Sequence, residues 1–191
     1  MLNICILSKF PPALLNDCIN YYKEVDKSTI NIPLTPYHTA ISASPVFLEQ
    51  VNKCLPIRLD SLELYSIAPN SLPIPHIDRG RKVALQIPLE LDINNTFTFA
   101  AKFENIKLLT PTDRQYHTIV DDAKIVNRPD YSFYEWDSEL YDTYNLELPI
   151  LQHVAQPHGG TNRSATKRVF LSGSYKRYEY NYIKDAFKEF Y

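Results

Sequence analysis

Between residues 59 and 175 the chain contains several short segments in which apolar residues recur at every second position. The segments 83–89 and 96–103 show this most clearly, because every odd-numbered residue in both is apolar. Successive side chains of a β-strand project to opposite faces of a sheet, so we expect sided strands here. Such a succession of short strands, with helices supplied at the start, predicts a mainly β fold with supporting helices: a double-stranded β-helix (jelly roll, cupin-like).

Helical periodicity is found near the two ends of the chain. Apolar residues recur at helical spacing over residues 12–26, and Ser44-Pro45 is typical of an N-cap followed by proline in the first turn of a second helix. We therefore expect N-terminal helices over about 12–55, a jelly-roll core over about 59–175 and a C-terminal helix over about 178–190. All of these belong to one domain, residues 1–191.

Composition and charge narrow the classes of function. The net charge of −2 argues against general nucleic-acid binding, and no stretch approaches the roughly 20 apolar residues of a membrane span. The three cysteines lie in the first third without metal-finger spacing, and the N-terminus lacks the features of a signal peptide. We expect a cytoplasmic protein with reduced thiols.

The segment 121–147 differs from the rest of the chain. It contains eight acidic and two basic residues, interleaved with aromatic residues. We interpret it as an insertion over the mouth of a pocket, and the alternative is a surface loop held by its aromatic side chains. An acidic rim would favour a neutral or basic substrate.

The residues best suited to bind a metal ion are His76 and Asp78, which lie two positions apart in the segment 73–89. On an extended strand both project from the same side and can bind one ion, although an isolated His-x-Asp is more often a solvent-facing pair. A second segment, 149–175, strengthens the metal-site interpretation. It predicts a strand, a turn on Gly159 and Gly160, and a second strand from Arg168.

In that second strand Val169, Leu171 and Tyr175 share one face, and His158 precedes the strand by ten residues. Two histidines and one carboxylate that leave positions open on the metal are the ligand set of non-haem Fe(II) oxygenases.

These residues resemble the motif of the Fe(II)/2-oxoglutarate-dependent oxygenases, of the short bacterial or phage type. His76, Asp78, His158 and Arg168 fill the family's His-x-Asp, distal histidine and arginine positions. Two segments resemble longer parts of the family pattern: the strand after the first ligands is matched by HIDRGRKVALQIPL, and the distal-histidine hairpin by PHGGTNRSATKRVFLSGSY. The resemblance spans roughly residues 60–175.

The resemblance implies a catalytic metal centre and a co-substrate site. His76, Asp78 and His158 would bind Fe(II), and Arg168 would hold the distal carboxylate of 2-oxoglutarate; O2 is the oxidant and ascorbate an optional reductant. Tyr65 matches a tyrosine that bonds the co-substrate in several relatives. Where many members have Ser or Thr two positions after the arginine, this chain has Phe170, with Ser172 two further on.

Two assignments stay open. His153 and Arg163 have the same ten-residue separation as His158 and Arg168. We favour the second pair, because Arg168 opens an apolar alternating strand whereas Arg163 lies among turn residues. Arg81 either faces the substrate or anchors the strand.

The implied activity is hydroxylation of an unidentified substrate with decarboxylation of 2-oxoglutarate to succinate. The substrate is a protein side chain, a small amino acid or a nucleobase, and a homodimer through the C-terminal helix is left open. One alternative is a binding or structural module, for example of a virion, that retains a metal-site remnant. Another is a cupin-type metalloenzyme that uses no oxo-acid.

Overall fold

The computed structural model describes most of the chain. It covers residues 4–25, 33–35, 38–69, 76–78, 80–90, 96–101, 131–133, 141–156, 158–162 and 164–191. For some strand residues, His76 among them, the backbone alone is described.

Two helices lie in the N-terminal third. Helix α1 (Pro12–Glu24) buries Leu14, Cys18 and Tyr22 at four-residue spacing, as an amphipathic helix against a sheet requires. Helix α2 (Pro45–Cys54) begins at Ser44, whose Oγ accepts a hydrogen bond from the N–H of Phe47 at 3.2 Å. The rings of Tyr21 and Phe47 stack 3.9 Å apart and join the two helices.

A seven-stranded antiparallel sheet forms the larger layer. Its strand order is β1-β10-β6-β12-β4-β3-β2. The strands are β1 (Ile4–Ile6), β10 (Ile150–His153), β6 (Val83–Glu90), β12 (Arg168–Tyr175), β4 (Ser61–Ile67), β3 (His38–Ser42) and β2 (Pro33–Thr35). Strands β2, β3 and β4 are neighbours both along the chain and in the sheet, whereas β6 lies between β10 and β12 and β12 lies beside β4, as the crossing connections of a jelly roll require.

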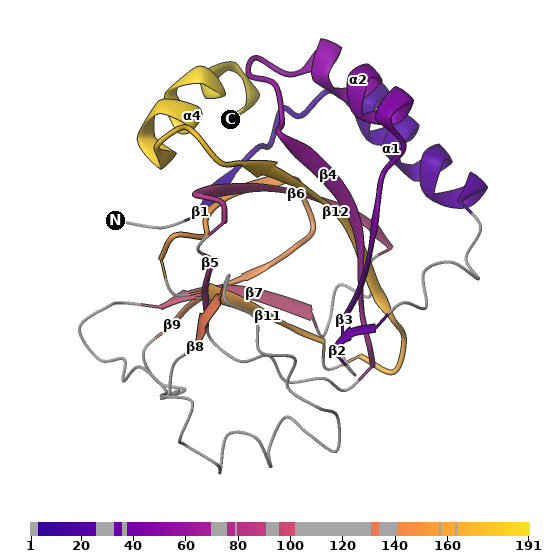
Figure 1. Cartoon of the computed structure of the whole chain (residues 1–191), viewed down its shortest axis with the longest axis vertical. Coiled ribbons are helices and arrows are strands. Elements are labelled where there is room, and N and C mark those ends of the chain that lie inside the picture. Colours follow the sequence, from indigo (N-terminus) through magenta and orange to yellow (C-terminus); the bar gives the residue numbers. More distant parts are fainter. Residues whose placement is uncertain are drawn as a thin grey trace.

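A five-stranded antiparallel sheet faces the larger one (Figure 1). Its order is β8-β5-β11-β7-β9. The strands are β8 (Tyr131–Phe133), β5 (His76–Asp78), β11 (His158–Asn162), β7 (Thr96–Ala101) and β9 (Tyr141–Asn145). The predicted mainly β jelly roll is confirmed by this pair of facing sheets.

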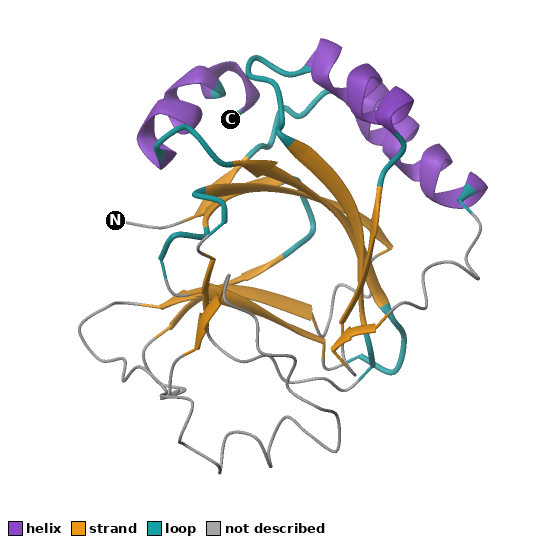
Figure 2. Cartoon of the chain, viewed as in Figure 1, coloured by secondary structure: helices purple, strands orange, loops and turns teal. Residues whose placement is uncertain are grey.

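The helices cover the outer face of the larger sheet, as Figure 2 shows in purple. Helix α4 (Tyr180–Ala186) and the 3-10 turn η3 (Lys188–Phe190) occupy the region expected to be a C-terminal helix. Within the described part of the chain, no helix combines the length and hydrophobicity that crossing a bilayer requires.

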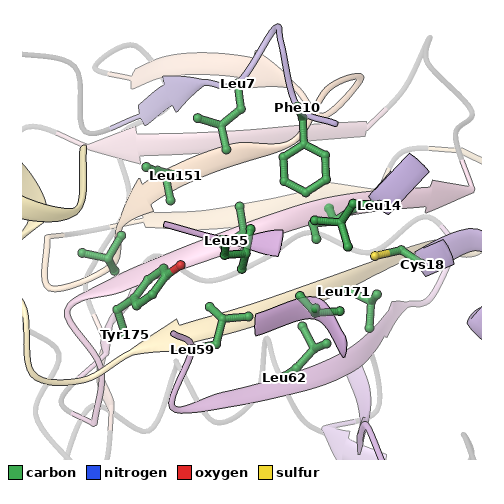
Figure 3. Close-up of a cluster of buried hydrophobic side chains, with 14 of the residues drawn as sticks. Leu7, Phe10, Leu14, Cys18, Leu55, Leu59, Leu62, Leu151, Leu171 and Tyr175 are labelled. Carbon is green, nitrogen blue, oxygen red and sulfur yellow. The ribbon is translucent and has the colours of Figure 1, made fainter. Parts of the chain in front are cut away.

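Strand β12 is buried on both faces. Val169, Leu171 and Tyr175 belong to the core cluster under the helices, part of which is drawn in Figure 3. Phe170 belongs to a second cluster with Ile67, Leu146 and Ile150. Since side chains alternate along a strand, this second cluster lies on the opposite face, between the two sheets.

One segment differs from the sequence expectations, and another is described only in part. Gly159 and Gly160 form no turn, because they lie within β11, opposite Phe99 and Thr98 of β7. The chain passes to the smaller sheet at this point, and glycine in a strand suits close approach of the neighbouring backbone. Two parts of segment 121–147 form β8 and β9, and most of the remainder lies outside the described residues.

Candidate metal and co-substrate site

The three predicted metal ligands lie on two neighbouring strands. His76 and Asp78 are the first and last residues of β5, and His158 is the first residue of β11. These strands are antiparallel, and their register places His76 directly opposite His158. The N–H of Asp78 donates to the carbonyl oxygen of Val154 at 2.9 Å, which joins the end of β5 to the segment that follows β10. Positions about 80 residues apart are thus brought together by strand pairing.

Asp78 and His158 form a buried pair. Their side chains are 3% and 5% exposed, and Nε2 of His158 lies 3.7 Å from Oδ1 of Asp78. Nδ1 of His158 lies 2.9 Å from the carbonyl oxygen of Gln156. A carbonyl oxygen only accepts, so Nδ1 carries the proton, and in the neutral ring Nε2 carries the lone pair toward Asp78.

This donor set fits a transition-metal ion. Metal-binding histidines usually donate the second ring N–H to a backbone carbonyl or carboxylate, as His158 does to Gln156. With metal–ligand bonds of about 2.0–2.2 Å, donor atoms 3.7 Å apart can bind one ion. Of the three predicted ligands, only Asp78 and His158 have described side chains. The described side chains therefore contain no complete three-residue cluster.

Arg81 connects this pair to the larger sheet. Its Nε donates to Oδ2 of Asp78, and its Nη1 donates to Oγ of Ser172 at 2.8 Å and of Ser174 at 3.4 Å. The Arg81 side chain is 15% exposed. Of the two interpretations left open by the sequence, these contacts favour anchoring. Arg81 thus links Ser172, which is predicted at the co-substrate site, to Asp78.

Arg168, the first residue of β12, is buried in the interior. Its guanidinium carbon lies 5.0 Å from the centre of the Phe170 ring, and that ring stacks on Tyr65 with centres 5.6 Å apart. Tyr65 is the cross-strand partner of Phe170 in β4. Burial lowers the pKa of the Arg168 guanidinium to about 10, so it remains protonated at neutral pH. The interior face of the larger sheet therefore carries a buried cation beside the Phe170 ring, which in turn stacks on Tyr65.

Two buried polar groups were missed by sequence reasoning. Gln86 donates from its side-chain amide to Gln152, between neighbouring strands β6 and β10. Asn162 donates to the carbonyl oxygens of Ile67, Ala68 and Thr166 at 3.1, 3.1 and 2.7 Å. Polar residues inside otherwise apolar strands were the available signal. The Asn162 network fixes the connection from β11 to β12 and hence the start of β12, where Arg168 lies.

His153, the alternative distal histidine, packs against a helix. Its ring stacks on Tyr180 of α4 with centres 5.0 Å apart. Tyr180 belongs to the core cluster on the outer side of the larger sheet, whereas His158 lies in the smaller sheet beside Asp78. Arg163, its proposed partner, lies outside the described residues.

This packing predicts a pH effect on stability. Burial lowers the pKa of His153 below its ordinary 6.5, against the opposing charge of Glu179. The unfolded chain then binds more protons than the folded chain as the pH falls through 6.5. The contribution of the neutral, buried His153 ring to the free energy of unfolding is therefore present above that pH and lost below it. His153→Phe, which keeps an aromatic ring against Tyr180, should lose less unfolding free energy than the wild type between pH 7 and 5. Urea unfolding in EDTA measures this, and parallel losses would contradict it.

Comparisons with known proteins place the fold. No protein-family model and no curated protein sequence matches the chain. Among solved structures, HygX from Streptomyces hygroscopicus with nickel, 2-oxoglutarate and hygromycin B bound is 16% identical, with a TM-score of 0.52 over 93% of this chain and 85% of that chain. A prolyl-4-hydroxylase from Pseudomonas putida is 10% identical, with a TM-score of 0.52 over 93% and 94%. The chain shares the jelly-roll fold of these solved neighbours.

Proposed function

We propose that this protein is an Fe(II)- and 2-oxoglutarate-dependent dioxygenase that hydroxylates an unidentified substrate and converts 2-oxoglutarate to succinate. The observation that carries the proposal is the buried Asp78–His158 pair, with His76 opposite His158 in the strand register. The fold, shared with HygX and the prolyl-4-hydroxylase, supports the same assignment.

In this proposal His76, Asp78 and His158 hold the ferrous ion. Two imidazoles and a carboxylate leave three positions for exchangeable ligands, which 2-oxoglutarate and O2 require. When bound, the ion supplies oxygen activation and oxidative decarboxylation. The protein supplies placement and exclusion of water, which the burial of Asp78 and His158 supports.

Arg168 is assigned to the distal carboxylate of 2-oxoglutarate. A guanidinium presents planar paired donors that match a carboxylate, and a bound anion would offset the desolvation of this buried cation. Tyr65 and Ser172 are assigned as further polar contacts. Both belong to the interior side of strands β4 and β12, and the Ser172 hydroxyl can donate to the co-substrate while it accepts from Arg81.

The direct test is co-substrate turnover. The purified chain with Fe(II), 2-oxoglutarate, O2 and ascorbate is expected to form succinate above the rate of free Fe(II), measured by mass spectrometry. Chelation with EDTA should stop the reaction and renewed Fe(II) should restore it. A binding module without catalysis predicts no succinate under any of these conditions, including with a cell extract as the source of substrate.

A further inference from the structure

Arg81 is the residue whose contacts the proposed chemistry does not yet use. It lies between β5 and β6, and its side chain turns inward to contact Asp78, Ser172 and Ser174. These partners come from facing sheets, since Asp78 ends β5 and the two serines belong to β12. One guanidinium thereby joins a predicted metal ligand to the most extensively paired part of the larger sheet.

The two oxygens of Asp78 have different surroundings. Oδ2 accepts from Nε of Arg81, while Oδ1 is the oxygen 3.7 Å from Nε2 of His158. A carboxylate held at one oxygen by a planar donor has the orientation of its plane fixed, because rotation would break that hydrogen bond. The oxygen on the His158 side then has a defined direction.

The serines fix Arg81 in turn. Ser172 and Ser174 are 1% and 4% exposed, and their hydroxyls accept from the same nitrogen, Nη1. Strand β12 pairs with β4 on one side and β6 on the other, so the acceptors are held in a sheet interior. Nε and Nη1 belong to one rigid fork, and a lysine could not reproduce both directions.

We propose that Arg81 is a positioning residue for the metal centre: it holds Asp78 through Oδ2 so that Oδ1 faces the ion beside His158. This inference rests on the proposed function, because it assumes that Asp78 binds a metal. Outer partners of metal ligands set ligand orientation, and their loss typically weakens metal binding about 10- to 100-fold. If the charge of Arg81 mattered more than its position, removal of this nearby cation would instead tighten metal binding.

The test is Co(II) binding by the metal-free protein, followed by calorimetry and by the visible absorption spectrum of the bound ion. Arg81→Ala and Arg81→Lys are both expected to weaken Co(II) binding about 10- to 100-fold and to alter the spectrum. The lysine variant keeps the positive charge, so it isolates the effect of losing the planar guanidinium. Urea unfolding midpoints of the metal-free variants identify any general loss of folding.

Arg58→Ala is the matched control. Arg58 also pairs with a carboxylate, that of Glu49, but this pair is exposed and lies on α2 and the segment after it. It should leave Co(II) binding and the spectrum unchanged. Wild-type affinity and spectrum in folded Arg81→Lys and Arg81→Ala, or tighter binding in Arg81→Ala, would overturn the inference. Absence of Co(II) binding by the wild type would instead overturn the proposed function, and the positioning role with it.

Discussion

Replacing Asp78 or His158 by alanine is expected to reduce iron-dependent succinate formation to the rate of free Fe(II). Each substitution removes one of the three proposed protein ligands, so only two side chains would hold the ion and it would bind more weakly. Succinate formation at saturating 2-oxoglutarate measures the effect. Co(II) binding measures it independently of turnover and should weaken sharply in both variants.

His153→Ala is the matched control for His158→Ala. It removes an imidazole that packs on Tyr180, outside the proposed centre, so it should lower stability while it leaves turnover per folded molecule unchanged. Full turnover in His158→Ala, combined with loss in His153→Ala, would move the distal ligand to His153. Full turnover in Asp78→Ala would exclude the proposed centre altogether.

The residue pattern contained most of the information on the fold. The alternation over 83–89 corresponds to β6, the apolar stripe from residue 12 to α1, and the Ser44-Pro45 cap to the start of α2. These features depend on local periodicity and capping, which a short window of sequence records. The Val169, Leu171 and Tyr175 face of β12 was predicted for the same reason.

The pattern did not contain the long-range partners. Arg81 and Ser172 are 91 residues apart, and nothing local at either position indicates that the two side chains meet. Gly159-Gly160 has the composition of a turn, yet pairing with β7 holds it in a strand. Tertiary pairing overrides local preference at such sites, and only the assembled sheets show which residues share the interior.

The position of Phe170 illustrates the difference. From the sequence it is a departure from the Ser or Thr that many oxygenases have two residues after the arginine. In the structure its ring contacts both Tyr65 and the Arg168 guanidinium. An aromatic face attracts a buried cation, so Phe170 supports the position of Arg168 without acting as a hydrogen-bond donor.

Arg168→Ala is accordingly expected to weaken 2-oxoglutarate binding more than it lowers turnover at saturation. Loss of one partner from a buried ion pair costs about 2–5 kcal/mol, which corresponds to at least about 30-fold in affinity. Arg168→Lys keeps a positive charge but loses the paired donors, so its affinity should lie between those of the wild type and the alanine variant. Apparent affinities from initial rates of succinate formation measure both effects.

Anaerobic calorimetry with 2-oxoglutarate and Co(II)-loaded protein separates binding from turnover. Burial has already lowered the pKa of Arg168, so Arg168→Ala also removes the desolvation cost of this cation and need not unfold more easily than the wild type. Arg168→Lys keeps a buried charge, so its unfolding midpoint is measured beside its affinity. A loss of affinity at an unchanged unfolding midpoint therefore reports on the carboxylate contact itself. An unchanged affinity for 2-oxoglutarate in both folded variants would contradict the assignment and transfer the carboxylate to another cation, with Arg163 the next to be replaced.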